Sequence, residues 1–284
     1  MLSSAWPRRK RAKPTTSLPD PAAPRDWAAL PYRILLDVFL KLGPREVMLG
    51  AEFACTAWRR VAVEEPALWR RVGWEDPMDF DRYRCFHVSV RMAMAWVAVA
   101  RAAGQCEAFK GDLEEEDLPH LVERAPSLRR LYLDYFSDGD SVEELVVALK
   151  KLPLLEDLQL SLSFFALHMD GEHNVLQCIC QVCPGLKTLV VMYASYTDPE
   201  YDAEGYPKEP IDGGITVMPN LRSLELYDCD LSVKGLNDIL DNCPLLESLV
   251  IYGYFNNGEM DKDLMGKLAR LKNLSLPTVV APMH

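Results

Sequence analysis

Apolar positions near the start of the chain recur at the spacing of an α-helix. Between Leu30 and Leu42, one helical face carries Ile34, Leu35, Val38, Phe39 and Leu42, and another carries Leu36 and Leu40. Pro31 suits a first helical turn, and Gly43-Pro44 predicts the end of the helix. A helix with this much apolar surface is either buried in a large core or shared between its own core and another protein.

A second pattern, LxxLxL, repeats six times in the rest of the chain. The copies occupy residues 127–133, 154–160, 185–191, 220–226, 245–251 and 270–276. Their starts lie 25 to 35 residues apart, and a proline precedes the first leucine by two positions in five of the six copies. The last two apolar positions alternate along a strand, so stacking the strands in parallel buries one continuous face. This spacing is typical of leucine-rich repeats.

The intervals between the repeats predict helices on the other side of the sheet. Helical spacing marks residues 141–151, 172–183 and 232–243, with Ser141 and Ser232 as N-caps, and Ser141 and Glu144 have the spacing of a capping box. Residues 91–103 predict an apolar helix that stops at Gly104. The interval at 193–217 is rich in proline, glycine and acids, which favours a projecting acidic loop. That loop is either a tolerated insertion, which we favour, or a partner contact through its tyrosines at 193, 196, 201 and 206.

The expected fold class is therefore α/β. A small helical unit precedes a short, curved leucine-rich-repeat solenoid, with a parallel sheet on its concave face and helices on its convex face. The expected organisation is a disordered basic tail at 1–25, the helical unit at 26–72, a junction with a capping helix or repeat at 73–110, and the repeats at 111–284.

The helical unit resembles an F-box. The matching residues are Leu30-Pro31, Ile34-Leu35, Val38-Phe39-Leu42, Val47-Met48-Leu49, Cys55-x-x-Trp58-Arg59 and Pro66-x-Leu68-Trp69. The alternative is an ordinary buried helical hairpin. The resemblance implies docking on the Skp adaptor of SCF (Skp–cullin–F-box) ubiquitin ligases, and the contact residues that it favours are Leu30, Pro31, Ile34, Leu35, Val38 and Phe39. Trp58 and Trp69 are instead assigned to the internal core or to the junction with the repeats.

F-box and repeats together resemble the plant F-box/leucine-rich-repeat proteins of the Skp-interacting-partner group. The resemblance implies a non-catalytic substrate receptor that reaches the cullin and RING ligase subunits through the adaptor and holds a protein target for ubiquitination and degradation. The main alternative is a non-degradative repeat scaffold, and an enzyme is a third hypothesis.

The side chains between the inward leucines of each repeat are expected to face the concave surface. The residues proposed to bind a target are Tyr132, Asp134, Gln159, Met192, Glu225, Tyr227, Tyr252 and Tyr254. The alternative is that these side chains only pack against one another across neighbouring strands.

The distribution of charge and the lengths of the apolar runs limit the classes of partner and the cellular compartment that we expect. The net charge is −11, but residues 1–25 carry +5, so the remainder is near −16, which argues against a nucleic-acid groove. No apolar run is long enough to span a bilayer, and no secretory signal precedes the eight cysteines, so reduced thiols in the nucleus or cytoplasm are expected. The cluster Arg8-Arg9-Lys10-Arg11 is either a nuclear-import signal or a solvated basic tail.

The sequence predicts no catalytic residues, metal or cofactor. Cys178-x-Cys180-x-x-Cys183 invites a zinc interpretation, but two of these positions would point apart on a helix and no second ligand cluster follows. Buried thiols are the preferred interpretation. No nucleophile elbow or phosphate-binding glycine loop is present, and the five histidines lie in no recognisable triad.

Overall fold

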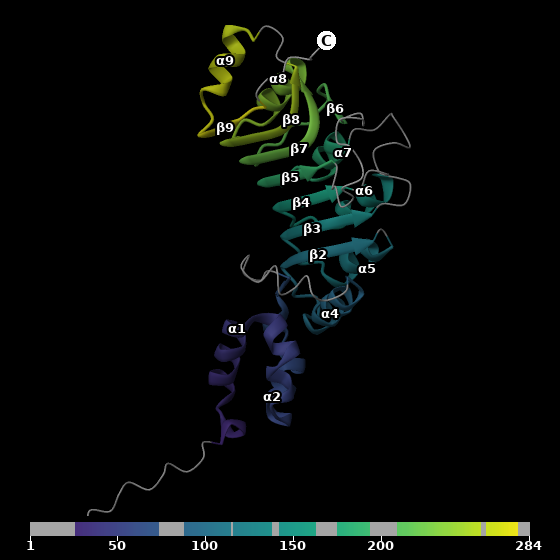
Figure 1. The fold of residues 1–284 in the computed structure, drawn as a ribbon, viewed down its shortest axis with the longest axis vertical. Helices are drawn as coiled ribbons and strands as arrows, with labels where there is room; N and C mark the ends of the chain where they lie inside the picture. The colour runs from purple at the N-terminus through teal and green to yellow at the C-terminus, as the bar shows by residue number, and fades with distance from the viewer. Residues whose placement is uncertain are drawn as a thin grey trace, which may run out of the picture.

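The computed structural model has two parts, a small helical unit and a parallel sheet with helices along one side (Figure 1). It describes residues 26–73, 88–114, 116–137, 142–162, 175–193, 209–256 and 260–277. The tail predicted at 1–25 and the predicted N-cap Ser141 lie outside the described residues. The α/β fold class, with a helical unit ahead of a parallel repeat sheet, is confirmed.

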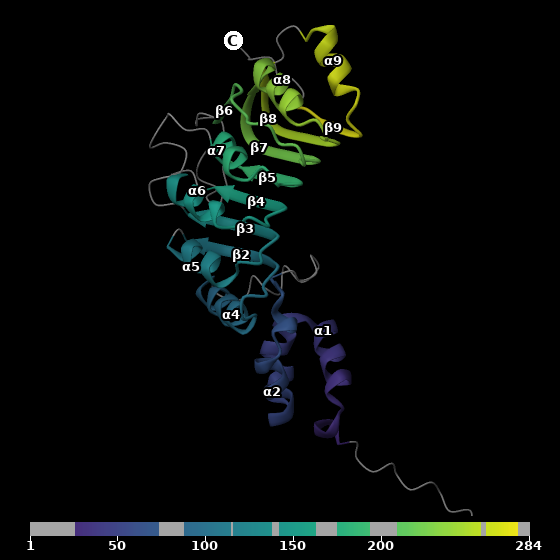
Figure 2. The same cartoon turned by 180° about the vertical axis from the view of Figure 1, so that it is seen from behind.

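The helical unit consists of two main helices joined by short 3-10 turns. Its elements are η1 Trp27–Ala29, α1 Tyr32–Leu49, η2 Ala51–Phe53, α2 Thr56–Glu64 and η3 Pro66–Trp69. Gly43 interrupts α1 with φ +82° and ψ 164°, a backbone conformation that glycine adopts easily, and Pro44 begins the second helical segment. The predicted helix end at Gly43-Pro44 is therefore present as a break. Helices α1 and α2 lie side by side (Figures 1 and 2).

The sheet is parallel throughout and follows the order of the chain. Its path runs through β1 Arg71–Val72, β2 Ala108–Glu114, β3 Arg130–Ser137, β4 Asp157–Leu162, β5 Thr188–Met192, β7 Ser223–Ser232, β8 Ser248–Asn256 and β9 Asn273–Ser275. The short strand β6 Glu209–Ile211 pairs with β7 off this path. All six LxxLxL copies produce the strands predicted for them, β3 to β5 and β7 to β9.

Strand β2 spans the boundary predicted between the junction with its capping helix or repeat, 73–110, and the repeats from 111. The predicted boundary cuts through this strand, which pairs in register with β3. At the three leucine positions of the motif, this repeat carries Cys106, Phe109 and Gly111, and the first two are buried. None of these three residues is a leucine and Gly111 has no side chain, so the LxxLxL pattern does not include this repeat.

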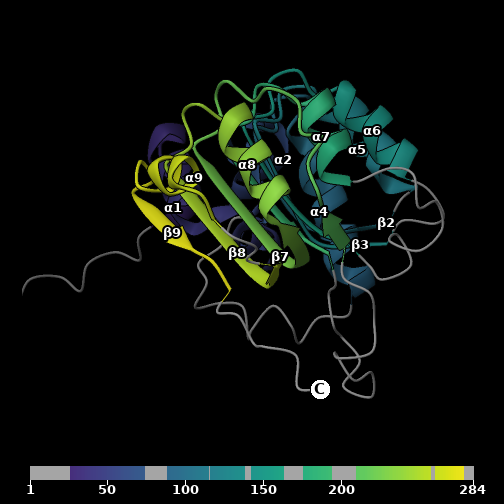
Figure 3. The ribbon, with the colours of Figure 1, turned by 90° about the horizontal axis from the view of Figure 1, so that it is seen from above.

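The connecting helices lie along one side of the sheet (Figure 3). They are α4 Val88–Arg101, α5 Asp117–Arg124, α6 Val142–Lys150, α7 Val175–Val182 and α8 Val233–Asn242, followed by α9 Lys262–Leu268 near the C-terminus. The predicted stop of α4 is confirmed, since Gly104 has φ +82°. The predicted N-cap of α8 is also confirmed, because Ser232 Oγ accepts a 3.0 Å hydrogen bond from the Gly235 backbone N–H.

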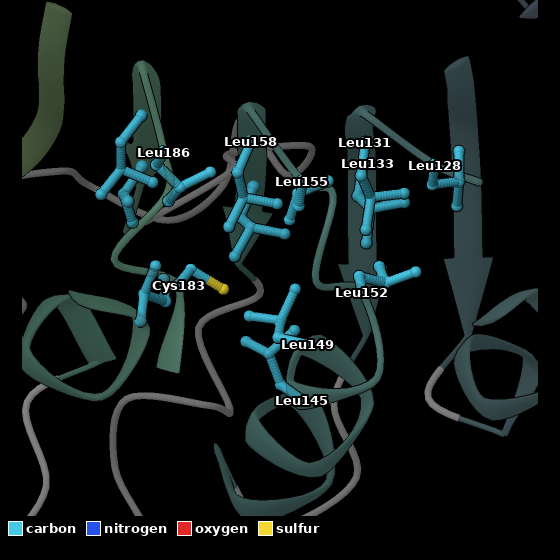
Figure 4. Packing of buried hydrophobic residues seen from close by; sticks show 14 of the residues in the cluster. Leu128, Leu131, Leu133, Leu145, Leu149, Leu152, Leu155, Leu158, Cys183 and Leu186 are labelled. Atoms are coloured by element: carbon cyan, nitrogen blue, oxygen red, sulfur yellow. The ribbon is translucent and has the colours of Figure 1, made fainter. Parts of the chain in front are cut away.

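Between sheet and helices lies a continuous apolar core (Figure 4). Equivalent leucines stand in register across neighbouring strands, and Leu131, Leu158 and Leu189 are all fully buried. Leu145 and Leu149 of α6 approach this row from the helical side. Burying one leucine side chain stabilises a fold by about 1.5–3 kcal/mol, so each leucine of the repeated row helps to hold the sheet against its helices.

The interval predicted to be a loop at 193–217 is partly ordered against the sheet. Tyr193 is fully buried, and Ile211 and Ile215 are also in the core. The Ile215 backbone N–H donates a 2.7 Å hydrogen bond to Asp238 on α8. The end of the interval is thus anchored rather than projecting, and Tyr193 offers no partner contact. The tyrosines at 196, 201 and 206 lie outside the described residues.

Candidate functional site

The first candidate surface is the outer edge of α1. Of the six residues predicted to contact an adaptor, Leu30 and Val38 are half-buried and Pro31 and Ile34 are exposed, Ile34 to 50%. Large apolar side chains elsewhere in the unit are also exposed: Trp27, Leu40, Leu42, Leu49 and Phe53. Exposed apolar side chains are numerous for so small a unit, which makes this surface a candidate for protein binding.

The prediction that Leu35 and Phe39 contact an adaptor directly does not agree with their burial. They are only 3% and 1% exposed, because they form the internal core between α1 and α2. Phe39 meets Trp58 edge to face, with ring centroids 5.6 Å apart. In the folded unit these two side chains leave almost no surface for direct contact with a partner.

Trp58 is half-buried, packs against the core of the helical unit and also contacts the N-terminal end of the unit. Its indole N–H donates a 3.0 Å hydrogen bond to the Trp27 carbonyl oxygen. Trp27, Ala54, Cys55 and Trp58 line a shallow apolar pocket there. Trp27, which forms part of the pocket lining, is 59% exposed.

The helical unit is joined to the repeats through Trp69, as predicted. This side chain is fully buried, and its indole N–H donates to the Ala62 carbonyl oxygen at 2.9 Å. The guanidinium of Arg101, at the end of α4, lies 4.9 Å from the Trp69 ring centroid and pairs with the Glu52 carboxylate at 2.6 Å. Arg101 and Glu52 were not predicted, since nothing in their sequence spacing links residues so far apart.

The second candidate surface is the face of the sheet directed away from the helices, here called the concave face. The strand register places Tyr132 beside Gln159, and it places Tyr227 between Met192 and Tyr252. These side chains are half-buried, except that Tyr252 is 53% exposed. The side chain of Tyr254 lies outside the described part of the structure.

Acidic groups set the electrostatics of the concave face. The Tyr227 hydroxyl donates a 3.0 Å hydrogen bond to Glu225, and burial together with that carboxylate raises the pKa of Tyr227 to about 12. Burial also raises the pKa of Tyr132, with contributions from the negative charges of Asp157 and Glu225. Asp134 lies 3.9 Å from Lys110, yet burial outweighs this cation and raises the Asp134 pKa.

A row of charged side chains at the starts of the strands was also not predicted from the sequence. The residue after the first leucine is charged in all six motif copies: Arg129, Glu156, Lys187, Arg222, Glu247 and Lys272. Glu156 pairs with Arg129 at 2.8 Å and with Lys187 at 2.9 Å. The six-fold recurrence was the signal that could have revealed these pairs.

The cysteines do not form a metal centre within the described residues, where no group of three or more metal-ligating side chains converges. Cys178, on α7, is half-buried, whereas Cys180 and Cys183 are buried. Burial raises the pKa of Cys183 to about 12 and also raises that of Cys180, which favours the neutral thiol over the thiolate at both positions. No described helix is both long enough and apolar enough to cross a membrane.

Comparison with known proteins agrees with this two-part architecture. Residues 27–73 match the F-box-like family model. The chain is 31% identical to F-box/LRR-repeat protein 22 of Arabidopsis thaliana, covering 90% of this chain and 78% of the relative. It is 32% identical to F-box/LRR-repeat protein 23, covering 89% of this chain and 54% of that relative, and 31% identical to F-box protein SKIP19, covering 81% and 70%, both from the same plant. The chain therefore belongs to the plant F-box/leucine-rich-repeat family.

Proposed function

We propose that this chain is the substrate-receptor subunit of an SCF ubiquitin ligase. The helical unit docks on a Skp-type adaptor and through it on the cullin and RING subunits, and the concave face holds a protein target. The observation that carries the proposal is the apolar edge of α1, with the exposed Pro31 and Ile34 and the half-buried Val38, within the part of the chain that matches the F-box-like model.

The chemistry in such a complex belongs to other subunits, so this chain acts by proximity. Tethering a target beside the ligase raises the effective concentration of the reacting groups without any catalytic side chain on the receptor. Trp69, Glu52 and Arg101 support this role, because their contacts fix the helical unit to the first repeat helix.

Binding to a purified Skp adaptor tests the first half of the proposal. Ile34→Asp places a charge on the exposed edge of α1 without removing a core side chain, and we expect it to abolish most adaptor binding. Val147→Asp is the matched control, because Val147 on α6 is 54% exposed and lies on the helical side of the repeats. If Ile34→Asp binds the adaptor as well as Val147→Asp does, α1 is not the docking surface.

Target lifetime tests the second half. In cells, proteins captured by the chain should persist longer when Ile34→Asp replaces the unmodified chain, because they are no longer brought to the ligase. An unchanged half-life, together with normal adaptor binding by the unmodified chain, favours the alternative of a non-degradative scaffold.

For localisation we propose the nucleus and cytoplasm, which a fluorescent fusion with Arg8, Arg9, Lys10 and Arg11 changed to glutamine would test.

A further inference from the structure

Three neighbouring strands build an aromatic and acidic patch on the concave face. The register of β5, β7 and β8 forms two rows of three side chains, Val190, Glu225 and Val250 in one row and Met192, Tyr227 and Tyr252 in the other. We call these six residues the tyrosine patch. The Tyr227 and Tyr252 rings are stacked, with centroids 4.9 Å apart and planes 16° apart. Strand β9 ends at Ser275 opposite Val250, and Tyr252 remains 53% exposed.

The patch has negative charge and lacks positive charge of its own. The segments that form β4, β5, β7, β8 and β9 contain no lysine or arginine, whereas they contain Asp157, Glu225, Asp228 and Asp230. Asp157 is paired with Arg130 at 3.1 Å, while Glu225 accepts its hydrogen bond from the neutral Tyr227 hydroxyl. The Glu225 carboxylate therefore lies beside an exposed aromatic surface, and the hydrogen bond that it accepts comes from a hydroxyl rather than from a cation.

The carboxylate, the tyrosine faces and the apolar side chains of the patch together complement a long, positively charged side chain. The long stems of arginine and lysine bury well against apolar surface while the charged head stays near water. Val190 and Met192 provide the apolar surface, and they stand in register with Glu225 and Tyr227, respectively. The head would then lie between the Glu225 carboxylate and the tyrosine rings, where ion pairing and cation–π attraction both act.

We propose that the tyrosine patch binds an arginine or lysine side chain carried by an exposed segment of the target protein. The proposal rests on the proposed function, since it names the chemistry of the target that the concave face receives. Arginine is the better fit, because its planar guanidinium can stack on a tyrosine face while donating two hydrogen bonds to one carboxylate.

Peptide binding to the free, full-length chain tests this proposal without any adaptor or ligase. We would probe the chain with an array of synthetic peptides in which every position is varied, and expect binders to be enriched in arginine and lysine. In the best binder, replacing the arginine with citrulline keeps the shape but removes the charge, and the affinity should fall about 5- to 10-fold. Binders without basic enrichment, or citrulline peptides that bind as tightly as arginine peptides, would overturn the proposal.

Variants of the chain locate the site. Tyr252→Ala and Glu225→Gln should each weaken the selected peptide about 5-fold, whereas Tyr252→Phe, which keeps the ring, should bind almost normally. Glu143→Gln is the control, because it removes the same charge from an exposed position on α6. Equal affinities for Glu225→Gln and Glu143→Gln would place the peptide elsewhere and refute the assignment.

The chain's own basic segment is the competing occupant. A full-length variant with Arg8, Arg9, Lys10, Arg11 and Lys13 changed to glutamine should bind the peptide with unchanged affinity. A clear rise in affinity would mean that this segment fills the patch, and the proposal of a target side chain would be wrong. Because peptide binding and adaptor binding are separate measurements, failure at the tyrosine patch leaves the adaptor test intact, and the reverse also holds.

Discussion

Removing the Arg101 side chain tests whether the helical unit is firmly attached to the repeats. In Arg101→Ala, the Glu52 carboxylate loses its partner at 2.6 Å while its side chain is only 9% exposed. Breaking a buried pair from one side costs about 3–5 kcal/mol, and because the Arg101 side chain is still 16% exposed we expect the lower end, about 3 kcal/mol. About 1 kcal/mol of this comes from the lost cation–π contact with Trp69.

Urea denaturation measures this loss as a fall in the free energy of unfolding. The matched comparison is Arg129→Ala, which breaks an ion pair with Glu156 at 2.8 Å between side chains that are 50% and 31% exposed. That exposed pair should be worth at most about 1 kcal/mol. The double variant Arg101→Ala/Glu52→Gln should recover about 2 kcal/mol, because it no longer leaves a carboxylate unpaired. If Arg101→Ala costs no more than Arg129→Ala, the junction is not held by this pair.

Three further predictions concern the repeats and are measured by urea denaturation. Leu189→Ala should destabilise the chain by about 3–4 kcal/mol, because Leu189 is fully buried, whereas Leu154→Ala, at a 46% exposed position, should change stability by less than about 0.5 kcal/mol; similar losses for both would contradict the assigned core. Ser232→Ala should cost about 1 kcal/mol through loss of the α8 N-cap, and Ser232→Asp should restore most of it; no loss in the alanine variant would show that the cap is not needed. Lys187 and Lys272 lower the pKa of Glu156 and Glu247 in the folded chain, so these carboxylates stabilise it above the ordinary glutamate pKa of about 4.3 and cease to do so as pH falls below that value. Glu156→Gln/Glu247→Gln should therefore flatten the fall in stability between about pH 5 and pH 3, and an unchanged pH profile would refute the pairing.

The repeat architecture could be predicted because its signal is redundant. Six copies of LxxLxL each specify a strand, so an irregular interval between two copies does not obscure the pattern. The repeat around β2 was only partly recognised, since Phe109 and Gly111 stand where leucines are expected. Strand β6 was missed because Pro210 and the acidic interval before it resemble a loop, and only pairing with the extended end of β7 makes it a strand.

The exposed apolar surface proposed for the adaptor could be expected from the sequence as a region, but its individual residues could not be assigned. Helical periodicity puts Ile34 and Leu35 on one broad apolar face, yet Ile34 is 50% exposed and Leu35 only 3%. The difference depends on where α2 packs, and Trp58 decides this by covering Phe39. A helical pattern reports how much apolar surface there is, but the division between internal core and partner surface is a tertiary property.

The concave face and the junction bear on the same proposed mechanism, because proximity is most effective when the two proposed binding surfaces are held in a fixed relation. A flexible link would spread a bound target over a large volume and lower its effective concentration at the ligase. Here the Trp69 indole donates a hydrogen bond to Ala62 and its ring contacts the Arg101 guanidinium. Glu52, in the helical unit, forms an ion pair with the same guanidinium. Arg101→Ala should therefore reduce ubiquitin transfer to a target that still binds, while Ile34→Asp should abolish transfer by removing the adaptor. If Arg101→Ala lowers the stability of the chain but leaves the transfer rate per bound target unchanged, a rigid junction is not required for the proposed activity.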